Sequence, residues 1–230
     1  MHKKTVTLAL GAAAVLAASG AFADNAAPND VRVGMYFVYF DTSATDIYGP
    51  YTPSGLNLKV NNLETLYLAY VRSLSDHIKL ELAFGYPPLT KTVGSGPASL
   101  GSVAYNGQTI ATARWLSPTL LAEYEFGDAN SRLRPYVGAG VNYTKFLSRR
   151  STAAGDAASG GPTSISLPAA LGPAVTVGLS YEITDRWHVY ASYSVAQVDT
   201  KLTADTAGIL RTSQIQFWPM TLVVSAGYSF

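Results

Sequence analysis

The chain is 230 residues long, contains no cysteine, and carries charge on only 13% of its residues. Disulfides are therefore excluded as the constraint that stabilises an exported fold. Two of the 16 basic residues lie in the N-terminal segment described next, which leaves 14 basic residues against 15 acidic ones. A nearly neutral chain without a basic cluster in its sequence is not expected to bind nucleic acid.

Residues 1–23 have the features of a cleavable secretory signal. They comprise, in order, a basic start (His2, Lys3, Lys4), an apolar stretch (6–18) and a small-x-small cleavage site (Ala21-Phe22-Ala23). A membrane helix, the alternative, needs a longer apolar run. We expect the mature protein to begin at Asp24, and residues 24–230 to form one domain.

From Val31 onward the sequence alternates with a period of two, which is typical of β-strands whose faces meet different surroundings. One face is apolar and the other is small and polar. A soluble β-sandwich also alternates, but its polar face normally carries more Lys and Glu, whereas a narrow barrel has little room inside. The pattern predicts an all-β fold, an eight-stranded antiparallel transmembrane β-barrel. Its expected strands are 31–41, 62–72, 77–87, 109–126, 134–146, 173–183, 186–198 and 219–230.

The connections between these strands alternate in length. Residues 73–76, 127–133 and 184–185 are short turns, whereas 42–61, 88–108, 147–172 and 199–218 are long and rich in Gly, Ser, Thr and Pro. Short periplasmic turns and long extracellular loops are typical of bacterial outer-membrane barrels. An even number of strands places both chain ends on the periplasmic side.

Several stretches resemble the OmpW family of small outer-membrane barrels, which includes the AlkL-type alkane-import proteins. The most specific are SPTLLAEYEFGDA at 117–129, RPYVGAGVNYT at 134–144 and the ending SAGYSF at 225–230. The resemblance follows the mature chain in order and departs in the loops, notably at 151–161. It implies a narrow apolar pocket and passive uptake of small hydrophobic molecules past the lipopolysaccharide layer, with exit sideways into the membrane. The aromatic ending Tyr228-x-Phe230 is the usual tail that barrel-assembly machinery accepts.

Strand parity directs several apolar side chains into the barrel. Of these, Tyr36, Val38 and Trp115 lie near the expected outer mouth, and we expect them to line a substrate pocket. The alternative is ordinary packing, because an eight-stranded barrel holds little more than its own side chains.

Charged side chains should also point inward, deeper in the barrel. They are Arg32, Lys79, Glu81, Glu123, Glu125 and Glu182. Charges in so narrow a space need partners, so we expect an ionic plug that closes the barrel floor; an ion pathway is the alternative.

Prolines interrupt two neighbouring strands. Pro87 and Pro88 end the third strand and Pro118 lies within the fourth. Because proline cannot donate to the hydrogen-bond ladder, prolines facing each other would leave a lateral seam in the wall. The alternative is that both merely end the strands at the membrane edge.

No catalytic constellation is expected. His77 and His188 are the histidines of the mature chain, and neither is followed by Ser two positions later, the pattern of the lipid A deacylases. Two isolated His and no Cys give no metal-ligand spacing, and no cofactor is predicted. The sequence thus indicates a channel that interacts with small hydrophobic molecules, outer-membrane lipid and lipopolysaccharide. The alternative function is a structural or surface-interaction barrel that transports nothing.

Overall fold

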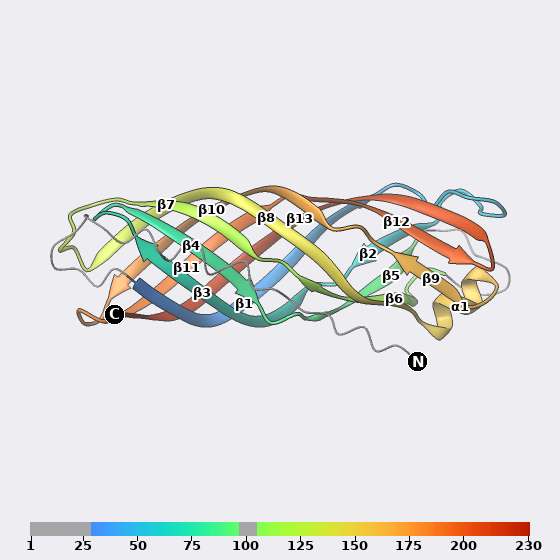
Figure 1. The fold of residues 1–230 in the computed structure, drawn as a ribbon. Coiled ribbons are helices and arrows are strands. Elements are labelled where there is room, and N and C mark those ends of the chain that lie inside the picture. Colours follow the sequence, from blue (N-terminus) through green and yellow to red (C-terminus); the bar gives the residue numbers. More distant parts are fainter. Residues whose placement is uncertain (1–28, 97–104) are drawn as a thin grey trace, which may run out of the picture.

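The computed structural model describes residues 29–96 and 105–230, and its strands form an elongated barrel (Figure 1). The predicted signal peptide lies outside the described residues. Eight strands close a ring: β1 (Asn29–Ala44), β3 (Leu63–Ser73), β4 (Ile78–Gly85), β7 (Thr119–Glu125), β8 (Leu133–Ser151), β10 (Ala170–Glu182), β11 (Trp187–Ala196) and β13 (Ile209–Ser229). Each is antiparallel to the next, β10 pairs with β8, and β13 returns to β1. The predicted eight-stranded antiparallel barrel is confirmed.

Near Asn29 and Phe230, which we call the terminal end, the strands have an apolar outer face. On β13, Leu222 and Val224 are 41% and 53% exposed, whereas Val223 and Ser225 are buried inside the ring. Outward apolar and inward small or polar side chains are the arrangement of a wall that faces hydrocarbon.

At the opposite end, which we call the loop end, the same strand reverses this arrangement. Above Pro219, the apolar Ile215 and Phe217 are buried inside, and the polar Gln214 and Gln216 are exposed. The predicted loop 199–218 is therefore wrong: it forms most of β12 (Val198–Thr206) and the upper part of β13, paired from Val198↔Phe217 to Thr206↔Ile209. A strand above the hydrocarbon faces water, so its apolar residues turn inward.

The other long connections also contain regular structure. They contribute β2 (Asn57–Val60), β5 (Leu89–Ser95), β6 (Thr109–Leu116), β9 (Thr163–Ser166) and the helix α1 (Ala153–Ser159). β5 and β6 form a hairpin that pairs with upper β8, β2 pairs with β5, and β9 pairs with β12. The predicted single strand 109–126 is thus two strands, β6 and β7, separated at Ser117-Pro118. These elements gather at the loop end (Figure 1).

The strands and helix that project at the loop end, which we call the extension, have an apolar core. It consists of Leu58, Ala170, Val198, Leu202, Ile215 and Phe217, contributed by four strands. Thr152 caps the N-terminus of α1, where its hydroxyl accepts from the Gly155 N–H, and Gly160 caps the C-terminus with a φ of 86°. No helix in the described part of the chain is long and apolar enough to cross a membrane.

Candidate functional site

The barrel wall is interrupted between β4 and β7. These strands pair from Ile78↔Tyr124 up to Ala83↔Thr119, and the next pair along this part of the wall is Leu89↔Arg114, between β5 and β6. Between these two pairs, residues 84–88 face residues 115–118, and no backbone hydrogen bond in the described chain joins the two segments. We call this interruption the wall gap.

The three prolines border the wall gap, but they do not face each other across it. Pro118 adjoins Thr119 at the lower end of the gap, whereas Pro87 and Pro88 adjoin Leu89 at the upper end of the opposite segment. The N and O atoms of one strand residue point to the same side. The Pro118 carbonyl accepts from the Tyr143 N–H on β8, so the donor that Pro118 lacks also faces β8.

Pro87 is the proline that faces the gap. Its carbonyl accepts a 2.8 Å hydrogen bond from Nη1 of Arg114, the β6 residue just above the opposite segment, in place of a strand amide. The backbone N–H of the neighbouring Tyr86 points away from the gap and donates to the Leu66 carbonyl on β3. The missing N–H of Pro87 is therefore directed across the gap.

A pocket lies directly inside the wall gap. Both edges of the gap line it: Ala83, Gly85 and Pro88 on one side, and Trp115, Ser117 and Thr119 on the other. The empty space amounts to about 820 Å³, part of which is open to solvent. Tyr36, Val38 and Trp115, named from strand parity, all lie in this lining.

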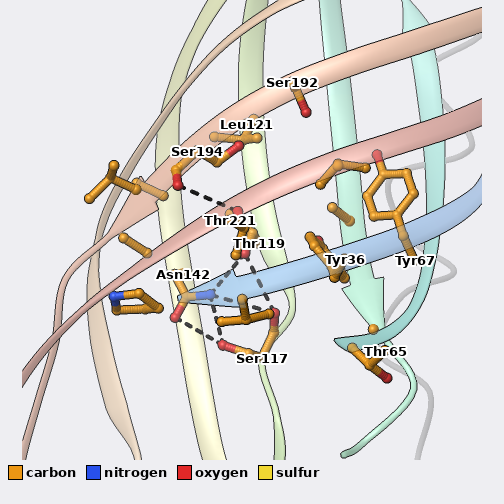
Figure 2. Close-up of a pocket in the computed structure, with 18 of the residues that line it drawn as sticks. Tyr36, Thr65, Tyr67, Ser117, Thr119, Leu121, Asn142, Ser192, Ser194 and Thr221 are labelled. Atoms are coloured by element: carbon orange, nitrogen blue, oxygen red, sulfur yellow. Dashed lines mark hydrogen bonds between the residues drawn. The ribbon is translucent and has the colours of Figure 1, made fainter. Parts of the chain in front are cut away.

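The two halves of the pocket differ in chemistry, as Figure 2 shows. On β1 and β3, the Tyr36 and Tyr67 rings meet edge to face with centroids 4.9 Å apart. On the far side, Asn142 Nδ2 donates to Ser117 Oγ at 2.9 Å and to Thr119 Oγ1 at 2.8 Å. These polar residues were not named from sequence, because they resemble the small polar side chains that fill any narrow barrel.

Two further cavities continue from the pocket toward the loop end. The first shares Trp115 with the pocket and is lined by Phe40, Phe217 and other apolar residues. The second shares Leu58 and Leu202 with the first and extends to α1. Trp115 therefore stands between the pocket and the next cavity, against Phe40 at 5.1 Å between ring centroids.

A buried ionic cluster closes the pocket on the terminal side. Arg32 Nη1 lies 2.5 Å from Glu81 Oε2, Nε lies 3.1 Å from Asp30 Oδ2, and Nη2 lies 3.6 Å from Glu123 Oε2. Tyr67 donates to the other Glu81 oxygen at 2.9 Å, and Tyr190 donates to Asp30 at 2.8 Å. Glu81 also lines the pocket, so the cluster forms its floor.

A second group of charges lies next to the first. Glu125 Oε2 contacts Lys79 Nζ at 2.8 Å and Arg134 Nη1 at 2.9 Å. Of the residues expected in the plug, Glu182 alone stands apart: it is half-buried and makes none of the ion pairs found among the described residues. Asp30 in the first group and Arg134 in the second were not named from sequence. Both lie at strand ends, where parity is least certain.

Comparison with known proteins identifies the family. The OmpW family model matches residues 29–230. Outer membrane protein W of Escherichia coli (strain K12) is 33% identical over 227 residues, covering 99% of this chain and 100% of that protein. The crystal structure of OprG from Pseudomonas aeruginosa superposes with a TM-score of 0.79 at 24% identity, covering 89% of this chain and 96% of that one. The solid-state NMR structure of AlkL has a TM-score of 0.65 at 20% identity, covering 92% and 95%.

These similarities confirm the predicted outer-membrane location and the absence of enzymatic activity, because the family consists of non-enzymatic outer-membrane barrels that include channels for hydrophobic molecules. The loop end is accordingly extracellular and the terminal end periplasmic. The chain belongs to the OmpW family of outer-membrane proteins.

Proposed function

We propose that this protein carries small hydrophobic molecules passively across the outer membrane, with entry at the loop end and exit sideways through the wall gap. The observation that supports this most directly is that one pocket is lined by both edges of an unpaired stretch of wall. A molecule in that pocket is separated from hydrocarbon by side chains alone, without a backbone ladder to open.

The floor of the pocket favours sideways over axial exit. Arg32 and Glu123 are 1% and 3% exposed and occupy the lumen together with Glu81 and Asp30. Opening an axial path would separate buried charges from their partners, which is costly in a low-dielectric interior. A hydrophobic molecule gains nothing from that route and gains burial by entering the membrane.

The cavities above the pocket support entry from outside. They follow one another through the apolar core of the extension, from α1 to Trp115. A barrel that served only as a structural or adhesive element would have no need of a series of apolar cavities ending at a wall gap. The geometry therefore favours transport over the alternative of a non-transporting barrel.

Pro87 and Pro118 provide the test of exit through the wall gap, because only Pro87 faces the gap. Pro87→Val supplies an N–H directed across the gap, where it can pair with the facing segment, whereas Pro118→Val supplies one directed at β8. Both variants are placed in liposomes, and uptake of an alkane and of a fatty acid ester is timed.

We expect Pro87→Val to slow uptake and Pro118→Val to leave it close to the wild-type rate. Equal rates for wild type and Pro87→Val would exclude the gap as the exit. Wild-type liposomes that take up neither probe faster than empty liposomes would exclude transport of such molecules altogether.

A further inference from the structure

One face of the extracellular extension is strongly basic. Strands β2, β5 and β6 and the upper half of β8 carry six basic residues and no acidic one: Lys59, Lys91, Arg114, Lys145, Arg149 and Arg150. We call these six residues the basic face. They are scattered over more than 90 positions of the sequence, which is why the composition gave no sign of a basic cluster.

Strand register brings these residues together. Lys91 pairs with Thr112, and Thr112 pairs with Arg150, so the two cations lie in one row across three strands. Leu116 pairs with Lys145 and places that lysine in a lower row. Lys59 lies on β2, opposite Val93 of β5. The rows span roughly 15 Å along β8, at about 3.3 Å per residue.

Five of these six side chains point outward. Strand neighbours such as Thr92, Ala113 and Phe146 line the internal cavity, and adjacent residues of a strand point to opposite faces. Arg149, which follows the irregular position Ser148, donates instead from Nη1 to the Leu167 carbonyl at 2.9 Å. All but Arg114 are exposed, and Arg114 is half-buried because its guanidinium bonds to Pro87 at the wall gap.

The basic face has no counter-charge of its own. None of the ion pairs found among the described residues includes any of the six. The exposed acids of the extension lie on other strands, with Asp41 on β1 and Asp199 on β12. The potentials of the six cations therefore add at one surface.

The height of the basic face indicates its partner. Tyr143, which is 44% exposed on the hydrocarbon side of β8, is followed two residues later by Lys145. Tyr39 and Trp218 mark a similar level on β1 and β13, where they pair with Met220 and Asp41 respectively. Exposed aromatic residues at one level form the girdle at the membrane–water interface. The basic face thus begins where lipid headgroups begin.

We propose that the basic face binds the phosphorylated headgroup of the glycolipid that forms the outer leaflet. Lysine supplies point charges for phosphate, and Arg150 offers a planar fork suited to bidentate phosphate contacts. Basic side chains near an anionic membrane surface strengthen binding cumulatively. This inference does not depend on the transport proposal. If both hold, the bound headgroup lies beside the upper part of the wall gap, which Arg114 borders.

The test compares two triple variants that lose the same charge. Lys91→Gln/Lys145→Gln/Arg150→Gln removes half of the basic face. Arg132→Gln/Arg186→Gln/Lys201→Gln removes three cations that are also exposed but lie elsewhere. Both proteins and the wild type are purified folded in a neutral detergent and titrated with diphosphoryl lipid A, with bound lipid counted by native mass spectrometry. Heat-dependent gel migration verifies that each barrel is folded.

We expect the first variant to bind diphosphoryl lipid A on the order of 100-fold more weakly than wild type, and the second to bind like wild type. Dephosphorylated lipid A should bind all three proteins equally weakly. Equal binding by the two variants would overturn the proposal, because total charge and not the basic face would then be responsible. Wild-type binding that is unchanged by removing the phosphates would overturn it as well.

Discussion

Arg32 and Glu81 form a 2.5 Å ion pair in the centre of the barrel, with both side chains almost wholly withdrawn from solvent. Arg32 also contacts Asp30 and Glu123, so one guanidinium neutralises parts of three carboxylates. Its Cζ atom lies 3.8 Å from the centroid of the Tyr190 ring, which adds a cation–π contact. The floor of the pocket therefore depends on this one side chain.

Arg32→Gln should destabilise the barrel and make it leak. The substitution leaves three buried carboxylates without their shared cation, and breaking a buried pair in this way costs about 3–5 kcal/mol. We expect a matching loss in the free energy of unfolding in urea, and a higher ion conductance in planar bilayers because water enters to solvate the carboxylates. Arg186→Gln, which removes an exposed arginine, should change the unfolding free energy by less than about 0.5 kcal/mol. Wild-type conductance in Arg32→Gln would show that other groups close the floor.

Trp115 separates the pocket from the cavity above it, so its size should set which molecules pass. Trp115→Ala joins the two spaces, and we expect faster uptake of broad apolar probes such as polycyclic hydrocarbons, with little change for a linear alkane. The measurement is the ratio of the two uptake rates in liposomes.

Trp115→Phe is the matched control for that experiment. It keeps a ring against Phe40 but removes the indole N–H, which is buried without a hydrogen-bond partner among the described residues. Because an unpaired buried donor costs about 1–3 kcal/mol, the lost N–H should offset the lost packing, and stability should stay close to wild type. A probe ratio in Trp115→Ala equal to that of Trp115→Phe would contradict the assigned separation.

Gly140 allows β7 and β8 to approach closely. A Cβ atom at this position would lie 1.8 Å from the Leu120 carbonyl oxygen, which belongs to backbone and cannot rotate away. Gly140→Ala should therefore lower the free energy of unfolding by about 1–3 kcal/mol, the usual cost of overpacking. Ala139→Gly on the same strand removes a methyl group from the outer face and should cost less. A smaller loss of unfolding free energy in Gly140→Ala than in Ala139→Gly would show that the strands can separate without penalty.

The sequence was informative where the strand faces hydrocarbon and misleading above it. On β13, Leu222 and Val224 lie outside as predicted. Beyond Pro219 the odd-numbered residues still point inward, but there they are the apolar ones, so that Phe217 lies inside. Without apolar residues on its outer face, this upper segment resembles a loop in sequence. Composition supported the mistake, because Gln, Ser and Thr are common both in loops and on water-facing strands.

The candidate site was predictable in its residues but not in its register. Parity alone placed Tyr36, Val38 and Trp115 inside the barrel, and all three line the pocket. The relation between Pro87 and Pro118 depends on which residues pair across the wall, and two strands of known parity still allow several registers that differ by two residues. The structure fixes that register at Ala83↔Thr119 and thereby separates the prolines.

Depth in the membrane should govern the cost of a charge on the outer face. Val177 lies midway along the apolar stretch of β10 and is 53% exposed, whereas Ile183, just beyond the strand's periplasmic end, is 55% exposed. Both face outward by strand parity, so they differ mainly in depth. Lysine at the bilayer midplane costs about 2–4 kcal/mol, and near the interface about 0–1 kcal/mol.

We therefore expect Val177→Lys to lower the unfolding free energy in lipid bilayers by that larger amount and Ile183→Lys to leave it almost unchanged. In a neutral detergent micelle, which lets water reach the lysine, the difference should shrink. Equal costs for the two variants in bilayers would mean that this face of β10 does not lie in the membrane.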